Sequence, residues 1–595
     1  MPRKTLKILG VHGLGDHRNS TWEDTWTKAL RGVFPSQDQI SIDPVFITYD
    51  DVFEKTDISV WEATGALWKL GKSGLSSLRR DRGWLDQVSE KIRWTAGYVV
   101  AWVEDDGFQR KTRKRILDAV IEHEPDIILG HSLGSLITYN AFSHEDALSG
   151  AAEPILRKST YVSLGSQIGN PFVVRNLTPG RIDALPVKAW RHLYNKNDDI
   201  FTAPIRLPGM ANFQQVDTPF DTPGVGDHSA EEYLTHINAL EGVWRPIVED
   251  AIDGRRFSPA AHRTRKPKAP ARAVSRRSRR ALLVGINDYP EEQDKLFGCV
   301  NDVFLMSSVL QECGFDPSEI RTCLDARATA SGILERMEWL LEDPQPNDER
   351  IFYFSGHGAR IPEYGENREP DHHLECLVPW DFDWSPATAI TDNQIAAQYV
   401  QLPYDTRLVM IFDCCHSGGI HRDGGAKSKG ITPPDDIRHR EMKWDLKTSM
   451  WVPRDFTRLD RGFSRSADYK EDFFGSNGAT FRLGRAVPYR GMTGAQYDRA
   501  KKKADGPIGP YLPLILEACG ESQLAYEYQH GVTSYGAFTF AIASILRRNA
   551  VSNPISFQKL MELTRDQLED LQYDQIPQIL GPNNVVKANV PWRVG

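Results

Sequence analysis

Long apolar runs are missing from this sequence. No stretch approaches the roughly 18 consecutive apolar residues of a membrane-spanning helix. The apolar run at residues 8–11 follows a basic N-terminus but is too short for the core of a secretion signal. We therefore expect a cytoplasmic protein with no stable membrane insertion.

An excess of positive charge is missing as well. The chain has 72 Lys and Arg against 80 Asp and Glu, a formal net charge of -8. Such a balance gives no overall attraction to nucleic acid or to anionic lipid. We expect no nucleic-acid partner.

The first half of the chain has no cysteine. All seven cysteines fall in the second half, an odd number without the paired spacing of a zinc site or of a small disulfide framework. They are Cys299, Cys313, Cys323, Cys376, Cys414, Cys415 and Cys519. The simplest explanation of this number and spacing is that the cysteines are reduced thiols and that the protein is in a reducing compartment.

Two segments of the chain alternate short apolar runs with longer helical patterns, as a mostly parallel sheet covered by helices requires. They predict an α/β domain at 1–252 and a second at 281–595. Between them, residues 253–280 contain eleven Lys or Arg and one acid, and we expect a flexible linker. Residues 419–510 lack hydrophobic periodicity and are expected to be a long, loop-like insertion.

The apolar runs give the candidate strands. In the first segment they lie at 7–12, 42–48, 126–129, 160–164, 188–194 and 213–216. In the second they lie at 281–286, 351–354, 408–412 and 511–518.

A strand, a turn and a helix pattern surround Ser132. The apolar run 126–129 enters Gly130-His131-Ser132-Leu133-Gly134, and a helical pattern follows. In this context the glycines permit a tight turn that holds the serine hydroxyl at the edge of the sheet. The main-chain N–H groups of Leu14, in the glycine-rich loop after the first strand, and of Leu133 are candidates to bind an oxyanion.

An acid and a histidine follow the serine in chain order. Asp198 and its neighbour Asp199 lie on a turn after a strand, and His228 lies on a loop before a helix. Together these motifs resemble the α/β-hydrolase family, especially its lipase and esterase-like members, over residues 4–250. The resemblance implies a Ser132, Asp198 and His228 triad, with Asp199 as a rival for the acid.

The substrate of this first domain is not specified by its motifs. Residues 61–115 are rich in Trp, Leu, Lys and Arg. A lid over an ester or lipid-like substrate and a docking surface both fit this composition.

Two further strands end in a histidine and a cysteine. The run 351–354 leads into Ser355-Gly356-His357-Gly358, and 408–412 leads into Asp413-Cys414-Cys415-His416-Ser417-Gly418. Adjacent parallel strands bring such tips to one edge of the sheet. There a histidine and a cysteine can act as base and nucleophile.

These residues resemble the metacaspases, which are caspase-like cysteine peptidases of family C14, over 280–419 and 511–546. The resemblance implies a caspase-like α/β fold with His357 as base and Cys415 as nucleophile. It also implies that the N–H groups of Gly358 and Cys415 bind the oxyanion. Cys414 is expected to pack inward, because side chains alternate along a strand.

The same resemblance implies a specificity pocket. The QACRG-type sequence of aspartate-directed caspases is absent, whereas Asp302, Ser355 and Asp413 match the metacaspase residues that line a pocket for Arg or Lys. Two carboxylates favour a bidentate guanidinium, so we expect cleavage of protein substrates after Arg first and Lys second. The alternative for Asp302 is a helix cap.

Many metacaspases need calcium, and the resemblance points to Asp371, Glu375 and Asp381 as its ligands here. Leu374 stands where the family pattern has an aspartate, which removes one oxygen ligand from an ion that wants six to eight. We therefore expect that no cofactor is required, with calcium left as an open possibility.

Taken together, these motifs predict a dual-domain hydrolase: a serine esterase-like domain fused to a cysteine endopeptidase that cuts after Arg or Lys. Fold-level analogy suggests a regulated defence or cell-death effector with a regulatory partner protein. The alternative is a protease whose first domain is a non-catalytic binding or sensing module. Basic residues in the insertion 419–510 predict self-processing there, with the linker as a second target.

Overall fold

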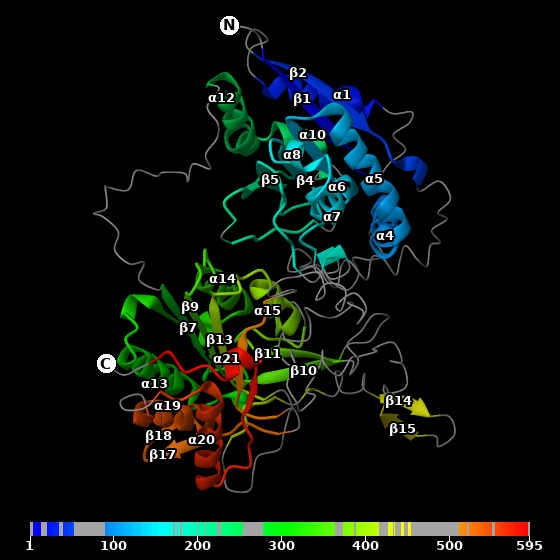
Figure 1. Ribbon diagram of the computed structural model, residues 1–595. Coiled ribbons are helices and arrows are strands. Elements are labelled where there is room, and N and C mark those ends of the chain that lie inside the picture. The colour runs from blue at the N-terminus through cyan, green and yellow to red at the C-terminus, as the bar shows by residue number, and fades with distance from the viewer. Residues whose placement is uncertain are drawn as a thin grey trace, which may run out of the picture. The chain divides into compact units, whose positions relative to one another are not determined.

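The chain divides into two compact units, Met1–Ala271 and Arg272–Gly595, in the computed structural model (Figure 1). The residues described are 4–13, 21–34, 40–52, 90–170, 173–174, 177–178, 181–198, 200, 202–208, 210–222, 228–253, 278–362, 373–385, 388–415, 427–431, 433–434, 442–445, 450–453, 511–520, 523–549 and 554–592. The predicted linker and most of the predicted insertion therefore lie outside the described residues.

The first unit contains a six-stranded parallel sheet in the order β2-β1-β3-β4-β5-β6. Its strands are β1 (Lys4–Val11), β2 (Ile40–Ile47), β3 (Ile127–His131), β4 (Thr160–Leu164), β5 (Ala189–Tyr194) and β6 (Phe213–Asp217). Each of the six predicted strands is present, with ends shifted by at most a few residues. The apolar runs were sufficient because both faces of this sheet are covered.

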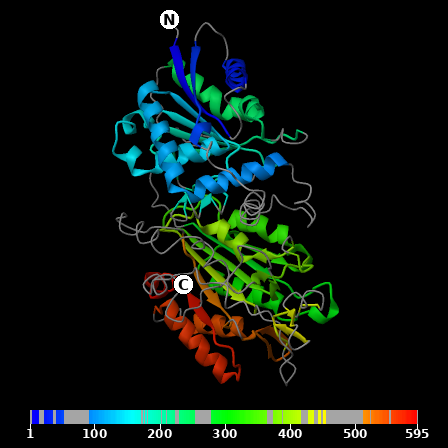
Figure 2. The ribbon, with the colours of Figure 1, turned by 90° about the vertical axis from the view of Figure 1, so that its right-hand side faces the viewer.

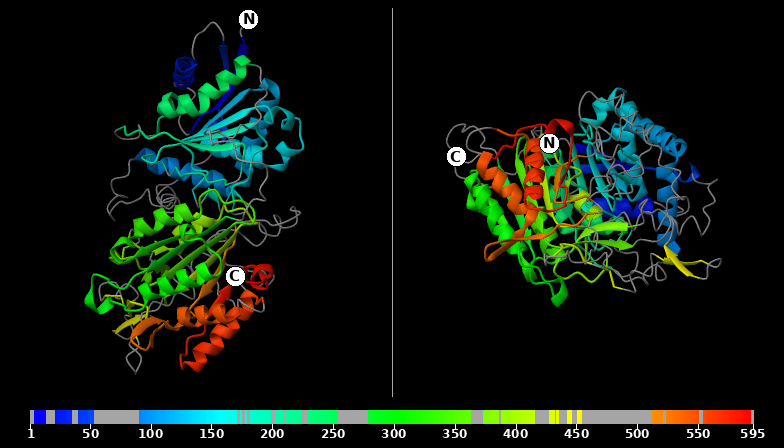
Figure 3. Two further views of the ribbon diagram at one scale, coloured as in Figure 1. Left: turned by 90° about the vertical axis from the view of Figure 1, so that its left-hand side faces the viewer. Right: turned by 90° about the horizontal axis from the view of Figure 1, so that it is seen from below.

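Helices lie on both faces of the fanned strands (Figure 3). They are α1 (Trp22–Val33), α4 (Glu90–Glu104), α5 (Asp106–His123), α6 (Leu133–Ser143), α7 (Glu145–Leu148), α8 (Glu153–Leu156), α10 (Ala230–Thr235), α11 (Ile237–Ala239) and α12 (Arg245–Asp253). Helices α4, α5 and α6 contribute to one hydrophobic core, and α1, α10 and α12 contribute to the other.

The predicted lid or docking segment, 61–115, is partly a core element. Residues 53–89 lie outside the described residues, but Trp102 and Val103 on α4 are buried in the core. The Trp102 indole N–H donates to Thr112 Oγ1 on α5 at 3.1 Å. Trp102 therefore packs the domain, so this described part of the segment is not a lid, whereas the two interpretations of residues 61–89 stay predictions.

The second unit contains a six-stranded sheet in the order β19-β16-β13-β9-β7-β8. Its strands are β7 (Arg279–Gly285), β8 (Ile320–Leu324), β9 (Glu349–Ser355), β13 (Arg407–Asp413), β16 (Leu514–Glu517) and β19 (Gln578–Leu580). Only β19 runs antiparallel to its neighbour. The predicted strands correspond to β7, β9, β13 and β16, whereas the edge strands β8 and β19 were not predicted.

Two layers of helices cover this second sheet. They are α13 (Cys299–Glu312), α14 (Ala330–Leu340), α15 (Asp392–Tyr399), α19 (Ala537–Asn549), α20 (Phe557–Asp570) and α21 (Asn583–Val586). Helices α13, α19 and α20 share one core, and α14 and α15 share the other. In Figure 2 the orange helices α19 and α20 lie together on one side of the sheet. The α/β prediction for this half is confirmed.

Short strands extend the second unit beyond its main sheet. They pair as β10 (Gly358–Pro362), β11 (His373–Leu377) and β12 (Ile390–Thr391), as β14 (Met442–Asp445) with β15 (Met450–Pro453), and as β17 (Glu527–His530) with β18 (Thr533–Gly536).

Among the described residues, no helix is both long and apolar enough to cross a membrane.

The register of β9 and β13 positions the cysteine site. Ser355 on β9 pairs with Asp413 on β13, at the carboxyl end of each strand. His357 and Cys415 each follow two residues later. The fold therefore carries the two residues to the same edge of the sheet, where sites in open α/β folds form.

Candidate active sites

His357 is held in one orientation by its neighbours. Its ring Nε2 lies 2.7 Å from the carbonyl oxygen of Asp294. Its backbone N–H donates to the Tyr289 hydroxyl at 2.9 Å, and the two rings pack with centroids 4.8 Å apart. A carbonyl accepts only, so Nε2 carries the proton and Nδ1 keeps its lone pair. Nδ1 is buried and has no hydrogen-bond partner, as a general base awaiting a proton requires.

Burial keeps both members of the predicted dyad neutral. It lowers the pKa of His357 to about 4, and the Asp294 carbonyl offsets this effect only in part. It raises the pKa of the Cys415 thiol to about 12, although a backbone hydrogen bond from Ala525 lowers it. The uncharged thiol and imidazole are thus the resting forms of this closed site.

The two adjacent cysteines lie on opposite faces of the sheet. Cys415 packs in the core formed with α13 and α19, and Cys414 packs in the core formed with α14 and α15. The side chain of Cys414 is buried, in agreement with the predicted inward packing. All seven cysteines are buried thiols.

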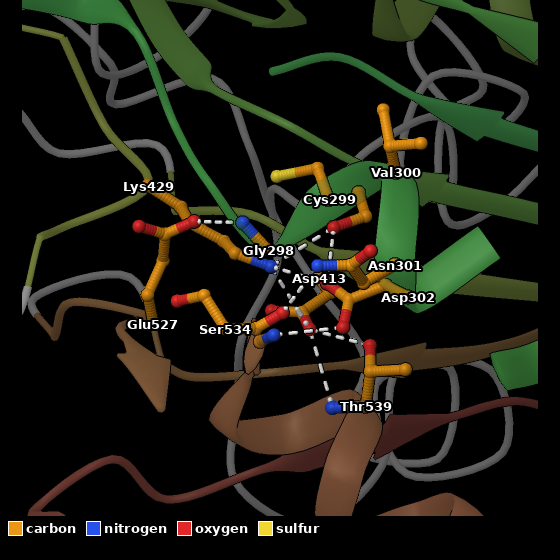
Figure 4. A network of polar contacts seen from close by, with 12 residues as sticks. Gly298, Cys299, Val300, Asn301, Asp302, Asp413, Lys429, Glu527, Ser534 and Thr539 are labelled. Carbon is orange, nitrogen blue, oxygen red and sulfur yellow. Dashed lines mark hydrogen bonds and ion pairs between the residues drawn. The ribbon is translucent and has the colours of Figure 1, made fainter. Parts of the chain in front are cut away.

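The three predicted pocket residues converge on the ammonium group of Lys429, and Figure 4 shows Lys429 with the two carboxylates, Asp302 and Asp413. Lys429 Nζ lies 3.0 Å from Asp302 Oδ2 and 3.1 Å from Asp413 Oδ2, and it donates to Ser355 Oγ at 2.9 Å. The Ser355 hydroxyl in turn donates to Asp302 at 2.8 Å. The three N–H donors of a lysine therefore have three acceptors in the pocket.

This pocket is fully buried and contains charges of both signs. Burial alone lowers the pKa of Lys429, but Asp302 and Asp413 outweigh that effect and hold the pKa well above its usual value. Burial raises the pKa of Asp302 to about 6, against the opposing pull of Lys429. The pocket is built for a cation, since two buried carboxylates without one would be costly.

Residues of the chain's last third close the pocket. The backbone N–H of Gly536 donates to Asp302 at 2.7 Å, and the Thr539 hydroxyl donates to Asp413 at 2.5 Å. A Cβ at Gly536 would lie 2.0 Å from Asp413 Oδ2 and 2.3 Å from Lys429 Nζ. Glycine is therefore needed at this position to leave room for a cation.

The alternative role of Asp302 as a helix cap is not observed. Asp302 lies inside the first turn of α13, and Gly298 precedes the helix. The side chain of Asn287 caps it instead, because Asn287 Oδ1 accepts from the N–H groups of Cys299 at 2.8 Å and Val300 at 3.3 Å.

The backbone of Lys429 lies where the sequence predicted an oxyanion site. Its carbonyl oxygen accepts from the N–H of Cys415 at 3.1 Å and from the N–H of Gly358 at 3.2 Å. These are the two donors named from the resemblance. The side chain in the pocket and the carbonyl between the donors belong to one residue, which therefore occupies the site as the residue before a scissile bond would.

Several of these residues were missed by sequence reasoning. Lys429 lies in the predicted insertion, without periodicity to mark it. Gly536 and Thr539 lie in the second stretch of the metacaspase resemblance, 511–546, but no role was assigned to them. Tyr289 precedes a short 3-10 helix and Asp294 ends it, and only the structure places them against His357.

Two of the three residues proposed for calcium have other partners. Glu375 pairs with Arg360 at 3.2 Å, and Asp381 Oδ1 accepts from the N–H of Ala330, the first residue of α14, at 2.8 Å. Asp371 lies outside the described residues. Among those described, no group of three or more His, Cys, Asp and Glu side chains is placed to hold a metal ion.

In the first unit, Ser132 occupies a strained turn between β3 and α6. Its backbone has φ 51° and ψ -128°, a conformation that L-residues rarely adopt. A Cβ at Gly134 would lie 2.2 Å from the carbonyl oxygen of His12, and one at Gly130 would lie 2.7 Å from Thr138 Oγ1. Both glycines of the motif are thus required by close packing, as the sequence predicted for a tight turn.

The predicted acid and histidine of the first unit are hydrogen-bonded to each other. His228 Nδ1 lies 2.7 Å from Asp198 Oδ2, and that carboxylate also accepts from the Tyr233 hydroxyl at 2.7 Å. His228 Nε2 is buried without a hydrogen-bond partner. The rival acid, Asp199, lies outside the described residues.

Ser132 and His228 border the same short segment. The N–H of Ser132 donates to the carbonyl of Leu164 at 3.1 Å. The next residue, Gly165, has φ 53°, and a Cβ there would lie 3.0 Å from the His228 ring. The predicted oxyanion donor Leu133 is the first residue of α6, whereas Leu14 lies outside the described residues.

The neighbouring histidines hold loops in place. His131 Nε2 lies 2.9 Å from the carbonyl oxygen of His228. The His12 ring stacks on Tyr49 with centroids 4.4 Å apart. Each contact fixes the position of the loop that carries the histidine.

Comparison with known proteins identifies the second unit. The caspase domain model of the C14 peptidases matches residues 278–587. Metacaspase-1 of Schizosaccharomyces pombe is 27% identical over 322 residues, which cover 51% of this chain and 66% of that protein. Inactive metacaspase-4 of Trypanosoma brucei brucei is 25% identical over 316 residues, 50% of this chain and 70% of that protein.

A solved structure was also matched. Caspase-1 from Spodoptera frugiperda aligns with 12% identity and a TM-score of 0.25, covering 51% of this chain and 86% of that chain. The chain spans about two thirds or less of the length of several metacaspase relatives. Because the family model matches more than half of the sequence and includes both His357 and Cys415, the chain belongs to the caspase-domain family of C14 peptidases.

Proposed function

We propose that the second unit is a cysteine endopeptidase that cuts proteins after Arg or Lys. The observation that carries this proposal is the placement of Lys429, whose ammonium contacts Asp302, Ser355 and Asp413 while its carbonyl accepts from Cys415 and Gly358. The side chain of one residue thus fills the acidic pocket while its carbonyl contacts both oxyanion donors, which is what a basic residue before a cleaved bond needs.

The geometry supports thiol chemistry at this site. His357 Nδ1 takes the proton of the Cys415 thiol, and the sulfur attacks the substrate carbonyl carbon. The N–H groups of Gly358 and Cys415 stabilise the oxyanion. The imidazolium then gives its proton to the leaving nitrogen as the C–N bond breaks, and water hydrolyses the thioester to release the new carboxylate.

The substrate preference is part of the proposal. The pocket as occupied fits an ammonium group, and the preference of Arg over Lys stays a prediction. A peptide library that varies only the residue before the cleaved bond tests it. Cleavage that depends on Cys415 and follows basic residues is expected, while cleavage after acidic residues would contradict it.

We propose in addition that the first unit is a serine hydrolase acting on an ester or lipid-like substrate. This is supported by the strained backbone of Ser132 and by the 2.7 Å contact between His228 and Asp198, with Nε2 of His228 unpartnered. Ester hydrolysis by the wild-type protein but not by Ser132→Ala tests it. Equal hydrolysis by both would favour the alternative, a binding or sensing module.

The proposal also covers the location, cofactor requirement and control of the two activities. Seven buried cysteine thiols are compatible with a reducing, cytoplasmic location. We propose that neither activity requires a cofactor, and that a regulatory partner or signal controls the peptidase. Retained peptidase activity after treatment with a calcium chelator is the expected result.

A further inference from the structure

We propose that Tyr233 is a positioning residue of the serine site, whose hydroxyl orients the Asp198 carboxylate that pairs with His228. This inference rests on the proposed serine hydrolase function of the first unit. It adds to the predicted triad a residue that belongs to none of the motifs in the sequence.

Both oxygens of the Asp198 carboxylate are held by donors. Oδ1 accepts from the backbone N–H of Ile200 at 3.0 Å. Oδ2 accepts from the Tyr233 hydroxyl at 2.7 Å and lies 2.7 Å from His228 Nδ1. Asp198 is buried, and a buried carboxylate needs such donors because an unpaired charge in the interior is costly. The Tyr233 hydroxyl therefore helps to fix the oxygen that faces His228.

The Tyr233 hydroxyl keeps its proton and donates it to Asp198. Burial first, and then the charge of Asp198, raise the pKa of Tyr233 well above its usual value. A hydrogen bond from the backbone of Asn195 to the hydroxyl opposes this rise. Because the hydroxyl oxygen accepts from Asn195 and a carboxylate can only accept, the hydroxyl proton points to Asp198.

A short segment brings Tyr233 and His228 to the same carboxylate oxygen. His228 directly precedes Ser229, whose hydroxyl caps α10 by accepting from the N–H of Glu232 at 3.4 Å. The N–H of Tyr233 donates to the carbonyl of Ser229 at 3.2 Å. This helical turn returns Tyr233 toward His228, so the two partners of Asp198 are fixed relative to each other.

The ring of Tyr233 is held as firmly as its hydroxyl. The side chain is fully buried and packs edge to face on Phe220, with ring centroids 4.9 Å apart. The carbonyl of Phe220 accepts from Asn195 Nδ2 at 2.9 Å, in the turn that leads from β5 to Asp198. These contacts join α10 to the turn that carries the acid. Tyr233→Phe removes the hydroxyl and keeps the ring, so it isolates the hydrogen bond.

The hydroxyl acts on the proposed reaction through Asp198. His228 takes the proton of Ser132 and becomes positively charged, while Asp198 stabilises that charge and holds the tautomer with a proton on Nδ1. A carboxylate that rotated away from His228 would do neither. Tyr233 opposes that rotation, which makes it a positioning residue and not a catalytic one.

The first test measures how fast a fluorophosphonate probe labels Ser132 in the purified full chain. Tyr233→Phe is expected to slow labelling about tenfold, as is typical for the loss of one hydrogen bond to a charged group. Tyr139→Phe is the matched control, because it also loses a buried hydroxyl, one that accepts from the N–H of Asp183 at 2.9 Å. It should be labelled at the wild-type rate. Thermal unfolding of both variants checks that each is folded.

The second test asks whether Tyr233 works through Asp198. In the Asp198→Asn background, where labelling is already slow, adding Tyr233→Phe is expected to change the rate by less than about twofold. A merely structural role would lower the rate equally in both backgrounds. A further tenfold loss in the Asp198→Asn background would therefore overturn the inference.

The third test needs no catalysis. In the full chain labelled with ¹⁵N-histidine, the Nδ1–H signal of His228 is identified by its loss in His228→Gln. Tyr233→Phe is expected to move this proton signal downfield, because Asp198 Oδ2 has lost one donor and accepts more strongly from His228. An unchanged signal would show that the hydroxyl does not act on this carboxylate.

The combined outcomes separate this inference from the function on which it rests. If the probe labels wild type and Tyr233→Phe equally fast, the role of Tyr233 is refuted and the hydrolase stands. If wild type is not labelled and hydrolyses no ester, the proposed function fails, and the role of Tyr233 in hydrolysis fails with it. A shifted His228 signal would then still support the orientation of Asp198 by Tyr233.

Discussion

The carbonyl oxygen of Lys429 accepts a hydrogen bond from the backbone N–H of Cys415 at 3.1 Å. The same residue places its ammonium group 3.1 Å from the Asp413 carboxylate, two residues before Cys415 in the chain. The end of β13 and the two residues after it therefore supply the proposed nucleophile, its proposed oxyanion donor and part of the proposed specificity pocket. The predictions below follow from this arrangement.

Removing the nucleophile or the base should abolish peptidase activity. We expect Cys415→Ala and His357→Ala each to lower kcat/KM for a basic peptide by about three orders of magnitude or more, because the two groups act as a unit. Cys414→Ala is the matched control: that side chain packs on the opposite face of the sheet and should retain most activity. If Cys414→Ala were inactive and Cys415→Ala active, the assignment of Cys415 as the nucleophile would be wrong.

Filling the space at Gly536 should weaken binding of a basic residue. A Cβ there meets Asp413 Oδ2 at 2.0 Å, so Gly536→Ala must push the carboxylate or the bound cation aside. We expect KM for an Arg peptide to rise by about tenfold or more. Gly32→Ala on α1 is the control, since a Cβ at Gly32 meets nothing within 4 Å. An unchanged KM in Gly536→Ala would remove this residue from the pocket.

Acidification should weaken the pocket through Asp302. Burial raises the pKa of this carboxyl to about 6, so as the pH falls below that value Asp302 takes up a proton and loses its negative charge. We expect KM of the processed enzyme for an Arg peptide to rise by about tenfold from about pH 7.5 to about pH 5. Asp302→Asn should have a high KM at both pH values. A similar pH dependence of KM in that variant would assign the effect to another group.

The serine site should react independently of the cysteine site. Ser132 is expected to be labelled by a fluorophosphonate probe in the Cys415→Ala protein as well as in wild type. Asp198→Asn should slow labelling by about 10² or more, since the acid holds His228 in its working tautomer. Asp199→Asn is the comparison variant. A larger effect at Asp199 than at Asp198 would transfer the role of the acid to Asp199.

The sequence predicted the parts of the fold that have strong local patterns. Strands β7, β9 and β13 are continuous apolar runs because both faces of the sheet are covered, and the motifs at their ends led to His357 and Cys415. Strand β8 was missed because it is an edge strand in which Cys323 is the only buried residue. Strand β19 is only three residues long.

The occupant of the pocket could not be predicted from sequence. Lys429 is one of many basic residues in a segment without periodicity, and no local pattern distinguishes it. Its position depends on pairing with Ala525 and on two carboxylates that are far away in the chain. Such non-local contacts carry no short-range signal. The role of Gly536 has the same origin, because it follows from what a Cβ would meet.

The most direct test of the central claim compares peptides that differ only in the residue before the cleaved bond. Purified wild-type protein, after any self-processing, is assayed on a Lys-Ser-X-Gly series in which X is Arg, Lys or Asp, with Cys415→Ala as the blank. The account predicts that kcat/KM for Arg and Lys exceeds that for Asp by about 10² or more, because a buried aspartate in this pocket would face two carboxylates without a cation. Preferred cleavage after Asp, or equal cleavage of all three, would contradict it.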